Sequence, residues 1–118
     1  YHCLCQKTLR LVCEELGLQK EKAVTAFQSR LGSAEWLKPY TSDVMKDLPK
    51  ENCKNILVIA PGFSMDCLET IEEIDEENKE YFIESGGEKF SYVECLNDSD
   101  EHVDFLKNFI KQQVSLWQ

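Results

Sequence analysis

Proline, glycine and positive charge are all scarce in this 118-residue chain. It contains three Pro and five Gly, and so few chain-breaking residues argue against a disordered polypeptide. Lys and Arg number 13 against 22 Asp and Glu, which gives a formal net charge of −9. Such a chain lacks the clustered basic side chains that bind phosphate, so nucleic acid is excluded as a partner and cations are favoured.

Long apolar runs are also missing. No run approaches the ~18 residues of a membrane-spanning helix, so we expect no transmembrane segment. The first residues lack the pattern of a secretory signal peptide, and they begin at Tyr1 rather than Met. We therefore expect a cytoplasmic location and a fragment of a longer protein, with peripheral membrane contact left open.

Cysteine is present six times but never as a C-x-x-C pair, and only two His accompany it. We expect free thiols in a reduced cytoplasm, where they behave as small hydrophobic side chains. A metal or iron–sulfur site is the lesser alternative, with Cys3 and Cys5 as its one suggestive pair, and a catalytic thiol is the least favoured.

The rest of the composition is that of a folded domain. Hydrophobic residues make up 42% and aromatic residues 10% of the chain, so we expect a single domain over residues 1–118 with one core. The hydrophobic pattern alternates between helical and strand periods. It predicts helices over 4–16, 43–48 and 66–85 and another after residue 98, and strands over 23–27, 55–60 and 89–95.

Local signals refine these elements. Gly17 is suited to end the first helix. The continuous apolar run 55–60 is typical of a strand that is buried on both faces. Asp98 and Glu101 have the spacing of a capping box at the start of the last helix. We expect the apolar stripe of that helix to face the core; it consists of Val103, Leu106, Ile110, Val114 and Trp117.

Strands that alternate with helices predict an α/β fold with a doubly wound parallel sheet and right-handed crossovers. This is the three-layer arrangement of Rossmann-like and flavodoxin-like domains. Such domains usually begin with a strand, which is often central, whereas this chain begins with a helix. We therefore expect one strand to be missing, between 23–27 and 55–60.

Ligands of open parallel sheets bind at the carboxyl ends of the strands. Three segments should meet at that edge: 28–39, 61–66 and 96–98. They bring large apolar side chains beside carboxylates, and this combination suits a flat hydrophobic ligand together with a cation. The side chains concerned are Gln28, Ser29, Arg30, Trp36, Phe63, Ser64 and Met65. Taken alone, Trp36 is better explained as a core residue and Arg30 as a surface or ion-pair residue.

One segment carries most of the excess charge. From Asp66 to Glu80 there are eight acids and one Lys, a net −7 of the total −9. Glu69, Glu73 and Glu77 stand at i, i+4 and i+8, and each like-charged pair costs a helix about 0.2–0.5 kcal/mol. A row of carboxylate oxygens could pass a divalent cation along. Local widening of the helix would straighten the row.

The alternative is a charged helix face that is simply solvated. Acids near a helix N-terminus also complement its dipole without any further role. Spacing alone leaves both interpretations of the acidic segment open.

Four quoted stretches resemble one enzyme family. They are "YHCLCQKTLRL" (1–11), "AFQSRLGSAEWLKPYT" (26–41), "APGFSMDCLETIEEIDEEN" (60–78) and "GGEKFSYVECLND" (86–98). In this order they resemble ferrochelatases, the lyases that insert Fe2+ into a porphyrin in heme biosynthesis. The resemblance is to the C-terminal half of a proteobacterial form, that is, to the C-terminal chelatase domain of a two-domain enzyme.

The resemblance implies roles for the acids. Glu69 matches the active-site Glu that faces the catalytic His across the porphyrin, and Asp66 matches the Asp that orients this His. Glu73 and Glu77 match acids that conduct metal or protons, so the three Glu are expected to contact iron. Gln28, Ser29, Trp36 and Phe63 match substrate-lining positions, and Met65 joins them on the rim.

The sequence also departs from the family pattern. The catalytic His belongs to an upstream motif, and neither His2 nor His102 lies in it, so we expect the chain alone to be inactive without the N-terminal half of the enzyme. Cys67 stands where animal members have a His. No cysteine trio follows Cys95, so no [2Fe–2S] cluster is expected. Fe2+ is a substrate together with protoporphyrin IX, and no resident cofactor is implied.

Other interpretations remain. Within the chelatases, a coproporphyrin ferrochelatase or a cobalt chelatase is the nearest alternative. A non-catalytic metal-binding module or a flavodoxin-like binding module is the alternative from another class.

Overall fold

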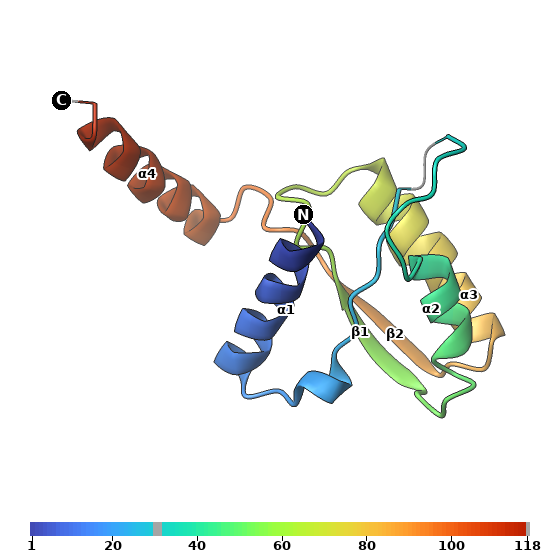
Figure 1. The fold of residues 1–118 in the computed structure, drawn as a ribbon. Helices are drawn as coiled ribbons and strands as arrows, with labels where there is room; N and C mark the ends of the chain where they lie inside the picture. The colour runs from blue at the N-terminus through green and yellow to red at the C-terminus, as the bar shows by residue number, and fades with distance from the viewer. Residues whose placement is uncertain (30–31, 118) are drawn as a thin grey trace.

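The computed structural model describes residues 1–29 and 32–117, in which helices surround two strands (Figure 1). The elements in chain order are α1 (His2–Leu16), the 3-10 turn η1 (Lys20–Lys22), α2 (Thr41–Asp47), β1 (Asn55–Ile59), the π-helix η2 (Glu69–Asn78), α3 (Lys79–Glu84), β2 (Lys89–Val93) and α4 (Asp100–Ser115). Each predicted helix is present, as are the second and third predicted strands, with ends that differ by a few residues.

The two strands form a parallel sheet, in register from Asn55 opposite Lys89 to Ile59 opposite Val93. The crossover through η2 and α3 joins them, as a parallel pair requires. The mixed α/β class with parallel strands is therefore confirmed. Over the described ranges, however, the sheet has two strands rather than three.

The strand predicted over 23–27 is wrong. This stretch is extended but forms a single bridge, between Phe27 and Tyr40. Phe27 donates its N–H to Pro39 O at 2.9 Å, and Thr41 donates its N–H to Phe27 O at 3.1 Å. A β-rich sequence becomes a strand only where a neighbouring strand continues the pairing. In the described part of the chain, this stretch pairs through the single bridge to Tyr40, and no ladder follows from it.

The core lies between the sheet and the helices α2 and α3. Met45, Phe82 and Phe90 are buried there, and the Phe82 and Phe90 ring centroids are 6.3 Å apart. Ile56 and Val58 of β1 pack against this cluster. Full burial of such a side chain contributes about 1.5–3 kcal/mol, so this small cluster accounts for much of the stability of the sheet–helix unit.

The prediction that β1 is buried on both faces is wrong. Leu57 and Ile59, which alternate with the core residues, are 67% and 46% exposed. In Figure 1, α2 and α3 lie on one side of the strands, while α1 stands on the other side. Yet α1 does not pack on the strands as α3 packs on β2, so the second helical layer of a doubly wound fold does not cover this face.

The acidic helix predicted over 66–85 is present but changes its form along its length. It is π-helical from Glu69 to Asn78 and α-helical from Lys79 to Glu84. The expected local widening is therefore confirmed. It covers the row of Glu69, Glu73 and Glu77.

The last helix differs from the prediction in its cap and its packing. The N-cap is Ser99, whose Oγ accepts a hydrogen bond from His102 N at 3.3 Å, so the capping box at Asp98 is wrong. α4 extends away from the sheet (Figure 1), and its predicted core stripe is exposed. In the part of the chain that the structure describes, α4 forms no extensive contact with another helix or strand, so the stripe has no partner there.

Two further expectations concern the chain as a whole. All six cysteines are free thiols, as predicted. Among residues 1–29 and 32–117, none of the helices combines the length and hydropathy that a membrane crossing requires.

Candidate functional site

The candidate site begins where the two strands end. The loop after β1 and the loop after β2 meet there, since Asn97 donates its N–H to Ser64 O at 3.0 Å. The π-helix η2 starts at this edge and continues along one side of the sheet (Figure 1). The acids of the predicted row therefore start at the carboxyl edge of the strands, where the sequence placed the site.

Glu69 is the first acid of the row, and its environment is the most unusual. Its Oε1 atom is buried and has no hydrogen-bond partner among the residues that the structure describes. Burial raises the pKa of Glu69, and the charge of nearby Glu73 raises it further. A carboxylate in this state readily accepts a proton, because neutralisation relieves both burial and repulsion.

Glu73 is held from outside its own helix. Gln28 donates from Nε2 to Glu73 Oε2 at 2.6 Å, across 45 positions of sequence. Asn78, which is only 1% exposed, donates from Nδ2 to the backbone O of Glu73 at 2.5 Å and to Gln28 Oε1 at 3.5 Å. The extended stretch before residue 28 thus lies against the π-helix.

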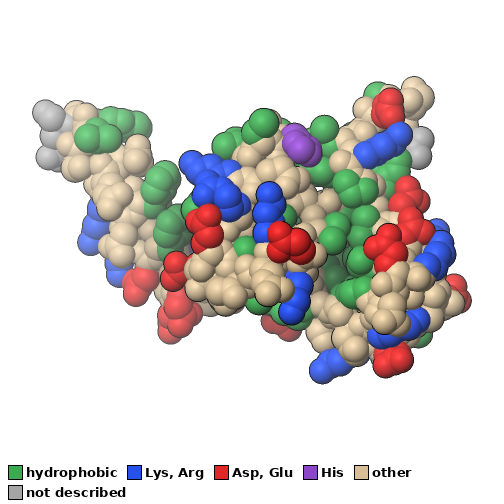
Figure 2. Space-filling model, turned by 60° about the horizontal axis from the view of Figure 1, so that its bottom comes forward, with side chains coloured by type: hydrophobic (Ala, Val, Ile, Leu, Met, Phe, Trp, Pro, Cys, Tyr) green, Lys and Arg blue, Asp and Glu red, His purple; other side chains and the backbone are tan. Residues whose placement is uncertain are grey.

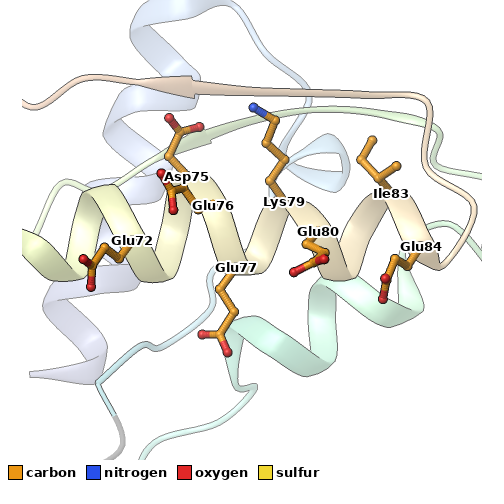
Figure 3. A pocket seen from close by; sticks show the side chains of 8 residues that line it. All are labelled: Glu72, Asp75, Glu76, Glu77, Lys79, Glu80, Ile83 and Glu84. Carbon is orange, nitrogen blue, oxygen red and sulfur yellow. The ribbon is translucent and has the colours of Figure 1, made fainter.

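Glu77 is exposed, and its partner is aromatic. Tyr81 donates its hydroxyl to Glu77 Oε1 at 2.6 Å, and Lys46 Nζ lies 4.0 Å from the centre of the Tyr81 ring. Figure 3 shows that Glu77 points to the opposite side of the helix from Asp75 and Lys79. The outer part of the acidic segment is therefore solvated, whereas Glu69 and Glu73 lie partly inside the protein.

Asp66 is the centre of a polar network before η2. Its carboxylate accepts hydrogen bonds from Thr70 Oγ1 at 2.9 Å, Tyr92 OH at 3.0 Å, Cys95 N at 3.1 Å and Asn97 Nδ2 at 2.8 Å. Asn97 is the largest cause that lowers the pKa of Asp66, to about 2, against the opposing effect of burial. Asp66 is thus held as an anion that ties η2 to the end of β2.

The same network suppresses ionisation of its neighbours. Burial, followed by the contacts with Cys95 and Asp66, raises the pKa of the Tyr92 hydroxyl well above its usual range. Burial also raises the pKa of the Cys95 thiol. Tyr92 and Cys95 are therefore neutral side chains that support the Asp66 anion, and the structure gives no sign of a reactive thiol at Cys95.

The predicted substrate-lining residues are only partly gathered. Phe63 and Ser29 are half-buried, and Ser29 has a left-handed backbone with φ of 69°. Trp36 and Met65 are 39% and 63% exposed, so Trp36 is not the core residue that its sequence environment favoured. Arg30 lies outside the described residues.

The sequence reasoning missed the amides and hydroxyls that hold the acids. They are Thr70, Asn78, Tyr81, Tyr92 and Asn97. Asn78 could have been found, because a polar residue stands between Ile74 and Phe82 on the buried face of the helix. Asn97 had no comparable signal, since its role depends on contact with Asp66, 31 residues away.

The acids do not form a preassembled metal cage. Across the described ranges, no three His, Cys, Asp or Glu side chains are grouped closely enough to hold a metal ion. The arrangement offers three different carboxyl groups: Glu69, with one buried oxygen and a raised pKa; Glu73, held by Gln28; and Glu77, which is exposed.

Comparison with known proteins identifies the family. The ferrochelatase family model matches residues 1–114. The chain is 56% identical over 117 residues to "Ferrochelatase" of Marinobacter nauticus, covering 99% of the chain and 32% of that protein. It is also 56% identical to "Ferrochelatase" of Hydrogenovibrio crunogenus, with 99% and 31% covered. "Ferrochelatase 2" of Shewanella oneidensis is 49% identical over 111 residues, with 94% and 34% covered. The chain spans about a third of the length of these curated relatives, and it belongs to the ferrochelatase family.

Proposed function

We propose that this chain supplies the acidic side of a ferrochelatase active site. The whole protein, a lyase of heme biosynthesis, would insert Fe2+ into protoporphyrin IX to form protoheme. The observation that carries this proposal is Glu69, at the start of a π-helix. Its Oε1 is buried without a hydrogen-bond partner among residues 1–29 and 32–117, and the pKa of its carboxyl group is raised. The family match adds the reaction class.

The chemistry explains why such a group is needed. Iron insertion forms Fe–N bonds as the pyrrole N–H protons leave, so a base must receive protons beside the ring. A partly desolvated carboxylate has its pKa closer to neutrality than a solvated one, which is the condition for efficient proton transfer. In our proposal Glu69 is this base or an iron ligand.

The other residues serve Glu69 and the substrates. Glu73 and Glu77 would deliver Fe2+ or carry protons away. Asp66 would orient the catalytic His, and its own network fixes the turn that leads into Glu69. The substrate-lining side chains would be Ser29, Trp36, Phe63 and Met65, with the porphyrin lying against their apolar and polar surfaces.

The partner in this proposal is the rest of the longer polypeptide. The chain corresponds to about a third of its relatives, and in the family the catalytic His belongs to the part that precedes it. The chain alone should therefore bind neither of the two substrates productively, and it should not catalyse iron insertion.

A chimera tests the proposal directly. This chain replaces the matching third of the Marinobacter nauticus ferrochelatase, with which it shares 56% identity, and insertion of Fe2+ into protoporphyrin IX is followed by absorbance. We expect activity in the chimera and its loss in Glu69→Gln. Glu72→Gln, at an exposed acid of the same helix, is the matched control and should retain activity.

The same assay separates the alternatives. Faster turnover with coproporphyrin than with protoporphyrin IX, or with Co2+ than with Fe2+, would show that the proposed substrate is wrong. A folded chimera that inserts no metal would contradict the function itself. Near-normal iron insertion by Glu69→Gln would remove the role assigned to Glu69.

A further inference from the structure

Two side-chain amides join the stretch before residue 28 to the π-helix. Gln28 uses both ends of its amide inside the protein: Nε2 donates to Glu73 Oε2 at 2.6 Å, and Oε1 accepts from Asn78 Nδ2 at 3.5 Å. Asn78 is 1% exposed, so it lies within the protein rather than at its surface. Each end of this amide therefore has a partner within the protein, and the two contacts use one of its two N–H donors and one of its two carbonyl lone pairs.

Asn78 also acts on the helix itself. It is the last residue of η2 and stands five positions after Glu73, the spacing at which a π-helix pairs its backbone groups. Its side chain donates to the backbone O of Glu73 at 2.5 Å. The Glu73 carbonyl is thus given a donor at the wide spacing, and the next residue, Lys79, begins an ordinary α-helix.

The two contacts converge on Glu73. Gln28 fixes its carboxylate, and Asn78 fixes its backbone. Glu69, one helical step earlier, has no such partner for its buried Oε1 among the described residues. The position of Glu73 relative to Glu69 therefore depends on a residue outside the helix, and an amide suits this role because it donates a hydrogen bond without neutralising the carboxylate charge.

We propose that Gln28 and Asn78 are positioning residues that hold Glu73 in the row beside Glu69 by keeping this turn of the helix wide. The proposal rests on the proposed function, in which Glu73 supplies iron to Glu69. It assigns Gln28 a place behind the acids, and not a contact with the porphyrin.

The test uses the chimera with the Marinobacter nauticus protein. Gln28→Leu and Asn78→Leu remove the amides at similar volume, and Gln28→Glu keeps the length but places a second carboxylate against Glu73. Gln113→Leu and Gln113→Glu, on the exposed face of α4, are the matched controls. The Michaelis constants for Fe2+ and for porphyrin are measured, together with hydrogen exchange of the η2 amides.

We expect all three variants to raise the KM for Fe2+ by roughly tenfold, as loss of a supporting partner usually does at a metal-handling site. The KM for porphyrin and the exchange of α4 amides should stay at control values, while η2 amides exchange faster. The Gln113 variants should change none of these quantities. Where a Leu variant fails to fold, Gln28→Glu carries the comparison, because it preserves size and polarity.

A swap variant separates positioning of Glu73 from general support. Gln28→Glu combined with Glu73→Gln restores an amide–carboxylate pair, but the carboxylate now stands at position 28 and the amide at position 73. Its η2 protection should recover, but its KM for Fe2+ should remain high. Recovery of both would show that the pair only supports the fold, and would overturn the proposal.

The proposal and the function on which it rests can fail separately. If the unsubstituted chimera inserts no iron, the function fails, and hydrogen exchange still decides whether Gln28 and Asn78 hold the helix. Unchanged η2 exchange in Gln28→Leu overturns the proposal in an active or an inactive chimera. Faster η2 exchange with an unchanged KM for Fe2+ overturns it as well.

Discussion

Asp66 and Asn97 hold each other through two hydrogen bonds, one in each direction. Asn97 Nδ2 donates to Asp66 Oδ2 at 2.8 Å, and Asp66 N donates to Asn97 Oδ1 at 2.8 Å. The pair joins the approach to η2 to the loop after β2. It therefore fixes the point at which the acidic row leaves the carboxyl edge of the sheet.

Acid should weaken this junction in a defined pH range. Hydrogen bonding to Asn97 is the main cause that lowers the pKa of Asp66 from its ordinary 3.8 to about 2 in the folded chain. The stability that this shift contributes is fully present above about pH 4 and is lost as the pH falls towards 2. Asp66→Asn should be less stable than the native chain at pH 7, and the two should converge near pH 2.

Urea unfolding at several pH values measures this effect. The exposed acid Asp98 gives the control variant Asp98→Asn, whose pH dependence should follow that of the native chain. If the free energy of unfolding of Asp66→Asn differs from that of the native chain by the same amount at every pH down to 2, the assigned role of the network is contradicted.

Glu69 should show the opposite pH dependence. Its pKa is raised, first by burial and then by Glu73. The stability that this shift contributes is fully present below the ordinary pKa of a Glu, near 4.5, and is lost as the pH rises through the higher pKa of the folded state. Glu69→Gln should therefore be more stable than the native chain at pH 7, and the difference should shrink below about pH 4.

The same variant should fail as an enzyme. Loss of a general base typically costs roughly 10²–10⁴-fold in rate, so iron insertion by the chimera should fall by that factor in Glu69→Gln. Increased stability together with lost activity is the signature of a residue kept for function. Thermal melts at pH 7 and pH 4, with Glu72→Gln as control, check the stability; a less stable Glu69→Gln at pH 7 would contradict the argument.

The two outer acids of the row should differ from one another. Glu73 is half-buried and fixed by Gln28, whereas Glu77 is exposed and accepts a hydrogen bond from Tyr81. In the chimera, Glu73→Ala should raise the KM for Fe2+ by roughly tenfold, and Glu77→Ala should raise it by about threefold or less, because solvent already screens it. Equal increases in the KM for Fe2+ and the KM for porphyrin would contradict a role of these acids in supplying iron.

Close packing at Gly87 gives a prediction about the fold alone. A Cβ at Gly87 would lie 2.2 Å from Phe82 Cε1, and Phe82 is fully buried in the core. Gly87→Ala should therefore destabilise the chain by about 1–3 kcal/mol, the usual cost of overpacking. Gly62→Ala is the matched control, since a Cβ there would meet nothing within 4 Å. Urea unfolding measures both, and equal stabilities would show that Phe82 moves aside easily.

The elements that the sequence predicted well are those with a local cause. The apolar run of β1 and the helical period before Gly17 depend on neighbouring residues, and both were found. The widening of η2 was expected because a row of acids needs it. By contrast, the stretch 23–27 has strand residues, but the described residues place no strand beside it. A sequence pattern does not show whether a neighbouring strand is present.

The candidate site divides in the same way. Repeated spacing singled out Glu69, Glu73 and Glu77, because like charges at i, i+4 repel. Spacing left a solvated helix face open as the alternative, and the roles predicted for the three acids came from the family resemblance. The acids differ in burial and in hydrogen bonding, and some of their partners come from distant positions, as Gln28 does for Glu73. A single sequence carries no signal for such contacts. The decrease in burial from the first acid of the row to the last was therefore found only in the structure.

The last prediction concerns self-association of the 118-residue chain. Its accessible surface is 9043 Å² and its radius of gyration 16.5 Å, whereas a compact monomer of this size would have about 6,600 Å² and about 13.5 Å. Figure 2 shows apolar side chains at the surface of α4, at the left, and in the central recess. Leu57 on the sheet and Ile110 on α4 are 67% and 57% exposed.

Exposed apolar surface and unpaired strand edges promote contact between chains, so we expect the chain alone to associate as its concentration rises. Size-exclusion chromatography from micromolar to millimolar concentration should show a shift to larger species. Leu57→Lys and Ile110→Lys should each reduce it if the sheet face and α4 respectively take part, while Lys7→Gln on the exposed surface of α1 should not. A monomer at all concentrations, with the β1 and β2 amides protected from hydrogen exchange, would show that a two-stranded sheet with one uncovered face is sufficient in water, against the expectation from its exposed area.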